Sequence, residues 1–534
     1  MLPSSPESIC GSGVGPSRAL RAVLLALVLA FAGLQLSRSP YSASEFRLVP
    51  DSQEYAIVAR RLATEGRYDF ELDGVAYPPG NSSWFPVLIA PVFWLAPGEL
   101  GNAVLPVFIL SLLGLLCAFA VATRLSNPVG GVLAVLALVE QKEFFAFARM
   151  VMSDVPALAF MLWACLLYLP ASQRGAPTVR PWRAGIAIAG AFALRSLFLV
   201  LLLPFALRWL QAVPRKASAL VSLAAPTFAV LVATWVYQQQ TFGDWRRGGF
   251  QYWLSVPYDY LSLVFSSDYF SANWAVFARP SALTTLALGC LGGLFLWRRK
   301  VTGARALAEF AGLAALPISV VHLFYYYPAM RFHLPSLALC CIAGAAGIAA
   351  LLPDWGERRQ YLVACALAAA MLFLPRAQDP EPRRRQAAEA IFAATPADAT
   401  IVTGLDGVYL GALEPGDSRR TYVPISRVVE YAAGLVTPRR IPDPDPPPKD
   451  AFDRRSPGLL RAGAYDVYPL TAAEAIPTIV QWVREGRAVY LDLTALKDQG
   501  AVDRLAAGGL ELAPLSAFPS LRRLELRRVG GKGQ

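Results

Sequence analysis

The segment PDSQEYAIVARRLATEGRYDF, residues 50–70, follows the first long apolar stretch of the chain and carries a carboxylate, Asp51, near its start. It predicts an amphipathic helix at the point where a membrane-spanning helix gives way to water. A carboxylate at the mouth of an intramembrane cavity calls for a functional explanation in a channel, a transporter or an enzyme. We favour the enzyme.

The composition places the chain among polytopic α-helical membrane proteins. Of its 534 residues, 55% are hydrophobic and only 16% are charged, and the mean hydropathy is +0.43. A soluble protein of this length carries far more charge. The sequence therefore predicts a flexible cytoplasmic tail over residues 1–18, a membrane domain over 19–375 and a small soluble α/β domain over 376–534.

Cysteine, histidine and basic residues exclude other classes. Six of the seven cysteines lie in apolar runs, so neither a disulfide framework nor a cysteine-rich metal site is predicted. His322 and His333 are too far apart for two ligands on one helix face, and we predict no required cofactor, with a divalent metal left open. The net charge of +11 would suggest nucleic acid in a soluble protein. Here the basic residues gather in short loops, and no nucleic-acid partner is predicted.

Apolar runs predict about eleven membrane spans. They cover residues 19–38, 101–124, 129–146, 154–170, 183–194, 196–210, 217–238, 282–297, 306–325, 333–352 and 360–375. With the N-terminal tail in the cytoplasm, every loop then assigned to the cytoplasm obeys the positive-inside rule. The basic residues of these loops are Arg124, Arg174, Arg180, Arg183, Arg208, Arg215, Lys216, Arg298, Arg299, Lys300, Arg305, Arg358 and Arg359.

Two segments leave alternatives to this topology. Residues 84–97 are apolar but short and closed by prolines, which favours an interfacial or re-entrant element, because a further crossing would invert every later loop. The first span could be a cleaved signal peptide with its cleavage site at residues 42–44, but its length favours an uncleaved anchor. The chain is then predicted to be a multi-pass protein of the cell (inner) membrane, within the lipid bilayer.

This topology brings embedded polar groups to the extracytoplasmic side. They are Asp51 after the first span, residues 140–149 after the third, Asp154 at the start of the fourth, Arg195 between two short spans and Arg331 before the tenth. Residues 39–101 and 239–281 are expected to cover them. The second segment is rich in aromatic residues, which suit a membrane interface and stacking on sugar rings.

Each of these groups also has a structural interpretation. Asp51 stands three residues before Glu54 and could be an N-cap with a capping-box partner, and Asp154 could likewise cap a helix. Arg195 could extend to the lipid headgroups, and Arg331 could be an anchor in an aromatic belt. Mutual ion pairing without catalysis is an equal alternative for two cations and their acidic neighbours, namely Lys142 and Arg149 with Glu140, Glu143 and Asp154.

Short motifs in a fixed order resemble those of the GT-C membrane glycosyltransferases. They are DSQEY at 51–55, EGRY at 65–68, YPPG at 77–80, MSDVPALAF at 152–160, ALRS at 193–196 and RFHLP at 331–335. The resemblance covers residues 19–375 and is closest to the branch that includes protein O-mannosyltransferases and the aminoarabinose transferase of lipid A. The first loop lacks the paired acidic residues of some members.

The resemblance implies an inverting transfer of a sugar from a polyprenyl-phosphate carrier to an extracytoplasmic acceptor, which could be an envelope glycan, a lipid or a protein. Asp51 would be the general base, and Asp154 would orient the acceptor or support Asp51. Cations are needed for the leaving lipid phosphate, and the candidates are Arg331 and Arg195, with Arg149 and Lys142 behind them. The expected substrate-binding residues are Glu54, Tyr55, Tyr77, Tyr327 and His333.

The main alternative is a membrane transporter or flippase of a lipid-linked sugar or another solute, because intramembrane charge would be natural there too. No inverted repeat is visible, and the polar residues lie at one face rather than near mid-membrane, which favours the enzyme. A purely anchoring role does not require so many spans. The high content of Ala, Leu and Arg suggests a GC-rich bacterial genome and so favours an envelope glycan.

The C-terminal segment has the pattern of a small α/β domain. A helix is predicted over residues 385–394, a further helical stretch over 476–485, and an extended Pro-rich linker over 442–449. Predicted strands are residues 399–403, YVPIS at 422–426, AVYLDL at 488–493 and LRRLELRRV at 521–529. Covering the active site or binding the acceptor is the expected role of this domain.

Overall fold

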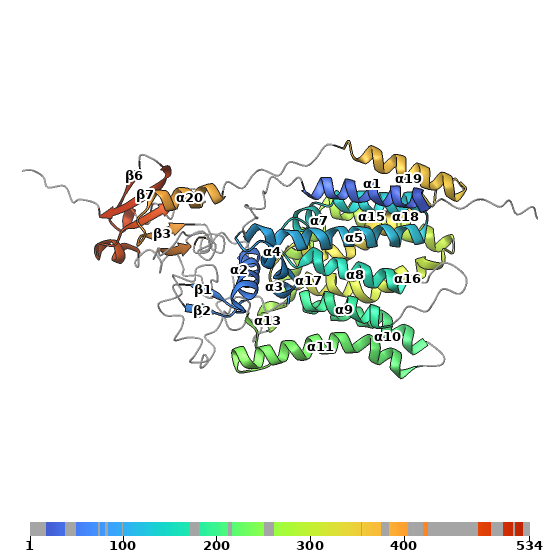
Figure 1. The fold of residues 1–534 in the computed structure, drawn as a ribbon, viewed down its shortest axis with the longest axis horizontal. Helices are drawn as coiled ribbons and strands as arrows, with labels where there is room; N and C mark the ends of the chain where they lie inside the picture. Colours follow the sequence, from blue (N-terminus) through green and yellow to red (C-terminus); the bar gives the residue numbers. More distant parts are fainter. Residues whose placement is uncertain are drawn as a thin grey trace, which may run out of the picture.

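The computed structural model consists of a bundle of apolar helices with a small sheet beyond one end of the bundle (Figure 1). The tail over residues 1–17, the aromatic segment 250–260 and the Pro-rich linker 442–449 lie outside the described residues. The structure describes residues 18–37, 50–72, 75–80, 84–98, 100–169, 181–211, 216–249, 261–353, 355–374, 384–403, 410, 420–424, 479–492, 503, 506–515 and 518–526.

Within these residues, six helical segments are long and apolar enough to cross a membrane, so the chain is a polytopic membrane protein. They coincide with six of the predicted spans. The helices involved are α1 (Arg18–Ser37), α5 (Val104–Leu125), α11 (Ala217–Phe242), α15 (Pro280–Arg298), α16 with α17 (Thr302–Phe310 and Leu316–Leu323) and α18 (Leu334–Ala349).

The other five predicted spans fall on shorter helices, and the full count of about eleven crossings stays a prediction, because a straight crossing needs about 20 residues. The predicted span over residues 129–146 was wrong as a single helix. The expected helix over residues 129–146 is broken, because α6 ends at Val139, Gln141 is extended, and α7 is a separate helix. These shorter helices are α6 (Pro128–Val139), α7 (Lys142–Phe147), α8 (Asp154–Tyr168), α9 (Pro181–Leu194), η2 with α10 (Ser196–Leu201 and Leu202–Gln211) and α19 (Glu357–Met371).

A layer of short elements lies at one end of the bundle (Figure 1). It contains α2 (Pro50–Glu65) and the antiparallel pair β1 (Phe70–Leu72) and β2 (Val75–Tyr77). Residues 84–97 do not form one helix: they hold two five-residue helices, α3 (Phe85–Ile89) and α4 (Pro91–Leu95), each with a proline in its first turn. Each is only about 8 Å long, which is far too short to cross a bilayer.

The second covering segment is anchored to the same end. It contains α13 (Leu261–Val264), η3 (Ser267–Tyr269) and α14 (Phe270–Phe277). The Asn273 side-chain amide donates to the Tyr325 carbonyl at 2.7 Å, and the Tyr326 amide donates to the Val264 carbonyl at 2.9 Å. Gly249 lies so close to the YPPG motif that an added Cβ would be 2.0 Å from the Pro79 carbonyl oxygen. Described parts of both covering segments therefore contact each other.

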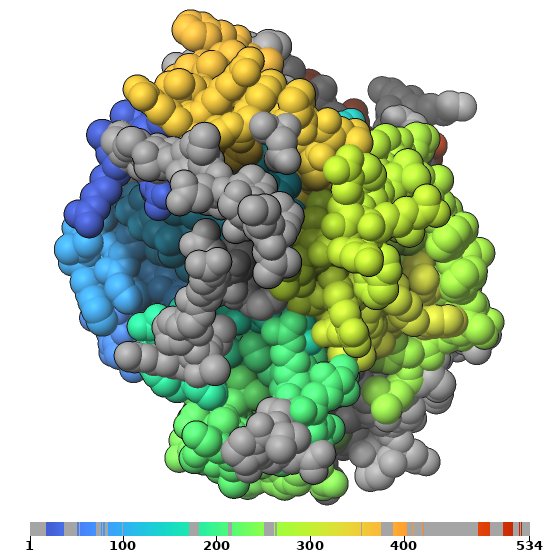
Figure 2. All heavy atoms as spheres, turned by 90° about the vertical axis from the view of Figure 1, so that its right-hand side faces the viewer, coloured from blue at the N-terminus to red at the C-terminus, as the bar shows by residue number. Residues whose placement is uncertain are grey.

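The opposite end of the bundle is basic. Figure 2 views this end, with α19 (orange) at the top and α15 and α16 (yellow-green) at the right. Cations of the loops predicted to be cytoplasmic are exposed here, and the orientation itself stays a prediction. They are Arg124, Arg183, Lys216, Arg298, Arg299, Lys300, Arg305, Arg358 and Arg359.

The C-terminal residues form a five-stranded sheet in the order β4-β3-β5-β7-β6, on the same side of the bundle as α2 (Figure 1). The pairs β3–β4 and β3–β5 are parallel, and β5–β7 and β6–β7 are antiparallel. The elements are α20 (Arg384–Ala394), β3 (Thr400–Thr403), β4 (Thr421–Pro424), β5 (Val489–Asp492), β6 (Leu510–Leu515) and β7 (Phe518–Leu526).

Glycines let α15 and α18 approach closely, and a substitution pair tests this packing. A Cβ added at Gly292 would lie 2.4 Å from the Ala343 carbonyl oxygen, whereas one at the neighbouring Gly293 meets nothing within 4 Å. Gly292→Ala should destabilise the protein by about 1–3 kcal/mol through overpacking. Gly293→Ala should leave stability unchanged or raise it slightly, because Ala is the better helix former. Thermal unfolding of the two purified variants measures the difference, and equal melting temperatures would contradict this packing.

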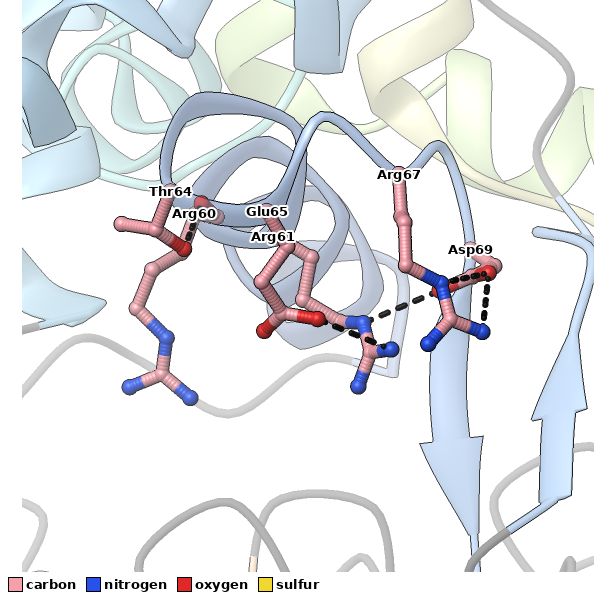
Figure 3. Close-up of polar contacts among 6 residues, drawn as sticks. All are labelled: Arg60, Arg61, Thr64, Glu65, Arg67 and Asp69. Carbon is pink, nitrogen blue, oxygen red and sulfur yellow. Dashed lines mark hydrogen bonds and ion pairs between the residues drawn. The ribbon is translucent and has the colours of Figure 1, made fainter.

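An ionic network holds the end of α2 to β1 (Figure 3). Arg61 lies between two carboxylates, with Nε 2.9 Å from Asp69 Oδ1 and Nη2 3.1 Å from Glu65 Oε2. Arg67 pairs with the same Asp69 at 3.0 Å. Because the Arg61 side chain is only 10% exposed, its charge depends on these partners.

Removal of the Asp69 charge should loosen this layer. We expect Asp69→Asn to destabilise by about 1–3 kcal/mol, since the buried Arg61 guanidinium loses its closest partner. Glu65→Gln is the matched control, because Glu65 is 45% exposed and such pairs contribute at most about 1 kcal/mol. Proteolysis in the 65–75 region and thermal unfolding report the two effects. A larger loss from Glu65→Gln than from Asp69→Asn would contradict the assignment.

Candidate active site

Four charged residues that are far apart in the sequence meet at one end of the bundle. Asp51 lies in the first turn of α2, and Asp154 is the first residue of α8. Arg195 stands between α9 and η2, and Arg331 lies in η5 (Met330–His333), directly before α18. All four are at helix ends, on the side of the bundle where α2 lies. We call Asp51, Asp154, Arg195 and Arg331 the charged cluster.

The cluster contains one tight and one open ion pair. Arg195 Nη2 lies 3.0 Å from Asp154 Oδ1, and the Asp154 side chain is only 2% exposed. Arg331 Nη2 lies 3.9 Å from Asp51 Oδ2, and the Asp51 side chain is 33% exposed. Arg331 also interacts electrostatically with Asp154, which joins the two pairs into one group. Asp51 is therefore the carboxylate that a ligand from water reaches, and Asp154 is held inside the protein.

The two acidic residues are not helix caps. Helix α2 begins at Pro50, whose fixed φ suits a first helical position, so Asp51 is the second residue of the helix. The cap position of α8 is Ser153, whose side chain makes no capping hydrogen bond. Both carboxylates lie in the first turns of their helices, where the helix dipole favours negative charge. The structural interpretation of Asp51 and Asp154 as caps was wrong.

The guanidinium groups of both arginines lie against aromatic rings. The Arg331 guanidinium carbon lies 5.1 Å from the Phe332 ring centre, 5.7 Å from Phe147 and 6.0 Å from Tyr327. That of Arg195 lies 5.4 Å from the Phe332 ring centre, and its side chain is 23% exposed. Aromatic faces attract guanidinium groups, so the rings stabilise both cations without using their hydrogen-bond donors.

Hydrogen-bonding capacity is left over inside the cluster. Within the described residues, Nε of Arg331, Nε of Arg195 and Oδ2 of Asp154 are buried and make no hydrogen bond, whereas Oδ1 of Asp154 is paired with Arg195. Buried polar atoms of this kind are rare in native proteins. The unused donors of the two arginines are the groups that an anionic ligand needs.

Two predicted phosphate-binding residues lie differently from expectation. Arg149 is 2% exposed and folds back onto α7: its Nε donates to the Phe145 carbonyl at 3.2 Å, and its guanidinium lies 3.7 Å above the Phe145 ring. Lys142 is exposed at the start of α7 and makes no ion pair with a described residue. Helix α7 contacts the charged cluster through Phe147, whose ring lies against Arg331, and this contact was not predicted from the sequence.

Glu54 and Tyr55 face the body of the protein. Glu54 is completely buried and interacts electrostatically with Tyr68 and with Tyr237 of α11. Burial raises the pKa of the Tyr68 phenol, and Tyr237, Glu54 and Tyr55 raise it further, so this hydroxyl keeps its proton. Tyr55 is 4% exposed and packs edge to face on Phe85 at 4.9 Å. Glu54 and Tyr55 both support α2, and Tyr55 also interacts electrostatically with Arg331 of the charged cluster.

The other predicted substrate-binding residues are divided. Tyr327 is 50% exposed and forms one side of the ring cage around Arg331, so it lies at the cluster. His333 is buried, and its ring packs on Phe277 at 4.5 Å. Tyr77 ends β2, and its side chain lies outside what the structure describes. In the described part of the chain, no group of three or more His, Cys, Asp or Glu residues could hold a metal ion.

Sequence reasoning missed two aromatic residues of the cluster. Phe332 contacts both arginines, and His322 stacks on Phe332 with its ring centre 4.3 Å away and the planes 9° apart. Phe332 was inside the quoted RFHLP motif, but nothing in that motif indicates contact with Arg195. His322 was considered only as a metal ligand. Its stacking partner, Phe332, lies in the next helical element, and sequence spacing does not reveal that contact.

The fold and the charged cluster define a polytopic membrane protein with an ionic site at one end of its helices. ArnT from Cupriavidus metallidurans, solved in the apo state, has a similar fold, with a TM-score of 0.51, 13% identity and coverage of 95% of this chain and 98% of that one. The fold that the motif resemblance implied is therefore confirmed, as a likeness of fold.

Two further structures are similar to lesser degrees. The same ArnT bound to undecaprenyl phosphate gives a TM-score of 0.46, 13% identity and coverage of 95% and 98%. The oligosaccharyltransferase AglB from Archaeoglobus fulgidus, in complex with an inhibitory peptide and a dolichol-phosphate, gives 0.40, 13% identity and coverage of 74% of this chain and 63% of that one. No protein-family model and no curated protein matches the sequence.

Proposed function

We propose that this chain is an inverting glycosyltransferase that moves a sugar from a polyprenyl-phosphate carrier to an acceptor on the extracytoplasmic side of the membrane. The observation that carries the proposal is the charged cluster. It brings an accessible carboxylate, Asp51, to one end of an apolar bundle together with two arginines whose Nε–H donors are buried and unused. A lipid-anchored phosphate and a water-soluble or lipid acceptor would meet at such a place.

Asp51 is the general base of the proposed reaction. As the acceptor hydroxyl oxygen forms its bond to the anomeric carbon, its proton passes to Asp51 Oδ2, and the opposite bond from that carbon to the carrier phosphate breaks. The electron pair leaves with the phosphate oxygen. At 3.9 Å from Arg331, Asp51 is beyond direct hydrogen-bond distance, so this arginine does not occupy the carboxylate oxygen that would take the proton.

Arg331 and Arg195 stabilise the leaving phosphate. Negative charge grows on the phosphate in the transition state, and fixed donors in a site shielded from water stabilise it without reorganisation. Arg331 is the primary donor to the phosphate, because its ion pair with Asp51 is open, at 3.9 Å, and competes little with a ligand. Arg195 carries a tighter pair with Asp154 and offers its remaining N–H groups.

Asp154 takes a positioning role in this proposal. Because its side chain is 2% exposed and lies 3.0 Å from Arg195, we assign it to holding that cation rather than to contact with the acceptor. This narrows the earlier expectation, in which Asp154 oriented the acceptor or supported Asp51. Arg149, packed on Phe145, is assigned to the support of α7, and Lys142 is left without a role in phosphate binding.

The carrier class follows from fold and charge together. The chain shares its fold with ArnT, a protein solved with undecaprenyl phosphate, and the two arginines suit a phosphate group. The exposed basic residues at the opposite end of the bundle support an orientation with that end in the cytoplasm and the charged cluster on the extracytoplasmic side. In a bacterial cell this means the inner membrane, with an envelope glycan, lipid or protein as acceptor.

A transfer assay tests the proposal. The purified protein in lipid nanodiscs is incubated with a total lipid extract that contains polyprenyl-phosphate sugars, and mass spectrometry follows carrier and products. We expect free polyprenyl phosphate to appear together with a glycosylated acceptor, with the configuration at the anomeric carbon inverted. Intact carrier lipids after incubation, combined with movement of the same lipids across proteoliposome membranes, would instead establish a flippase.

A further inference from the structure

The two arginines of the charged cluster share one aromatic ring. Within the described part of the chain, Phe332 is the only ring that lies against both guanidinium groups, at 5.4 Å from Arg195 and 5.1 Å from Arg331. Phe332 is 7% exposed, so the ring is a fixed part of the interior. One side chain that carries no charge thus lies against two mutually repelling cations.

Phe332 is itself held in place by α17. The His322 ring stacks on it at 4.3 Å and 9°, and Tyr325 meets it edge to face at 5.4 Å and 87°. His322 is anchored because its Nδ1–H donates to the Ile318 carbonyl at 2.7 Å. Stacked and edge-to-face rings at these distances attract each other, so Phe332 has one preferred orientation.

Helix α17 is in turn attached to α18. A π-helical turn, η4 (Ala311–Ala315), precedes α17. Such turns free backbone carbonyls and often occur at functional sites. Here Ser336 of α18 donates to the Ala315 carbonyl at 3.1 Å and hydrogen-bonds Ser319 at 2.7 Å. The stack of His322 on Phe332 therefore joins two helices that are fixed to each other.

We propose that Phe332, backed by His322, is a positioning residue that fixes Arg195 and Arg331 relative to each other, so that both bind the phosphate of one lipid carrier. The inference rests on the proposed function. A phosphate held by two arginines needs both at a set separation, because a misplaced donor loses most of its effect. The ring supplies that separation without occupying a guanidinium N–H group, and the Nε–H donors of both arginines stay available to the ligand.

Binding of undecaprenyl phosphate to the full-length protein in nanodiscs tests the inference. Phe332→Leu keeps an apolar side chain but removes the ring, and we expect about tenfold weaker binding, because both cation–ring contacts are lost. Phe332→Tyr restores the ring and should bind within about twofold of the wild type. His322→Phe, which keeps a stacking ring, should bind like the wild type, whereas His322→Ala should bind about threefold more weakly.

A buried ring elsewhere supplies the control. Phe310 is completely buried and packs on Tyr168 at 5.5 Å, in a different part of the bundle. Phe310→Leu should lower the melting temperature without changing the affinity of the folded protein for undecaprenyl phosphate. If Phe332→Leu behaves in the same way, the role of Phe332 is structural and the inference is overturned.

The wild-type measurement separates this inference from the proposed function. If the wild type binds undecaprenyl phosphate, Arg331→Gln weakens that binding and Phe332→Leu does not, the arginines bind the carrier without help from the ring, and only the inference fails. If the wild type does not bind undecaprenyl phosphate at all, the proposed carrier is wrong and the inference falls with it. Weakening by Phe332→Leu with recovery in Phe332→Tyr supports both.

Discussion

Asp51→Asn should reduce sugar transfer by about 10²–10⁴-fold, the usual contribution of a general base. Asparagine has nearly the same shape but cannot take the acceptor proton. The fold should survive, because Asp51 is 33% exposed and its nearest cation is 3.9 Å away. Initial rates with purified variants and the lipid-linked donor measure the effect.

Carrier binding by the same variant separates chemistry from recognition. Removal of the negative charge beside Arg331 should leave the affinity for undecaprenyl phosphate unchanged or higher, since a competing carboxylate is gone. Glu65→Gln, which neutralises an exposed carboxylate at the other end of α2, should keep the wild-type rate. A rate for Asp51→Asn within about threefold of the wild type would show that Asp51 is not the base, because a base contributes far more.

Arg331→Gln should give the second large effect, a loss of about 10²–10³-fold in transfer, comparable to removal of one donor from an oxyanion site. Unlike Asp51→Asn, it should also weaken carrier binding, because the cation contacts the phosphate in the ground state too. Arg246→Gln is the control, since that side chain is 72% exposed and pairs with Asp244, two residues away in the sequence.

The double variant adds a sharper test. If Asp51 and Arg331 act on the same transition state, their effects should be strongly non-additive, so that Asp51→Asn with Arg331→Gln is little slower than the worse single variant. Full additivity of the two losses would place the residues in separate functions. A normal rate for Arg331→Gln would remove the phosphate assignment altogether.

Much of the fold could be predicted from sequence because hydrocarbon imposes a simple rule: apolar runs must form helices that satisfy their own backbone. The six long spans followed from this rule, and the helix that starts at Pro50 followed from its amphipathic pattern. The break after Val139 did not, because the apolar residues on both sides of it read as one run. Helix lengths depend on such breaks, and periodicity alone does not place them.

The charged cluster could be predicted because topology alone brings helix ends together. Asp51, Asp154, Arg195 and Arg331 were assigned to one side from the alternation of the spans, and the structure brings them together. Which residues pair with which in the site could not be predicted from the sequence. Rotamers and packing in three dimensions decide these contacts. They pair Asp154 with Arg195, fold Arg149 onto Phe145 and pack His333 on Phe277.

The C-terminal strands show the same division. Short β-rich stretches indicated strands where β3, β4, β5 and β7 occur. The order β4-β3-β5-β7-β6, with parallel and antiparallel pairs in one sheet, could not be read from the chain, because long-range pairing leaves no local pattern. The predicted roles of this sheet, covering the site or binding the acceptor, remain predictions.

The most direct test of the enzymatic assignment is made in cells. A strain that lacks the protein is complemented with the wild-type chain or with an equally abundant Asp51→Asn variant, and polyprenyl-phosphate sugars and envelope glycans are compared by mass spectrometry. We predict that the variant leaves one carrier-linked sugar accumulated and one glycan linkage missing, and the missing linkage would identify sugar and acceptor. Full restoration of that linkage by Asp51→Asn would contradict the assignment of Asp51 as the base and, with it, the mechanism.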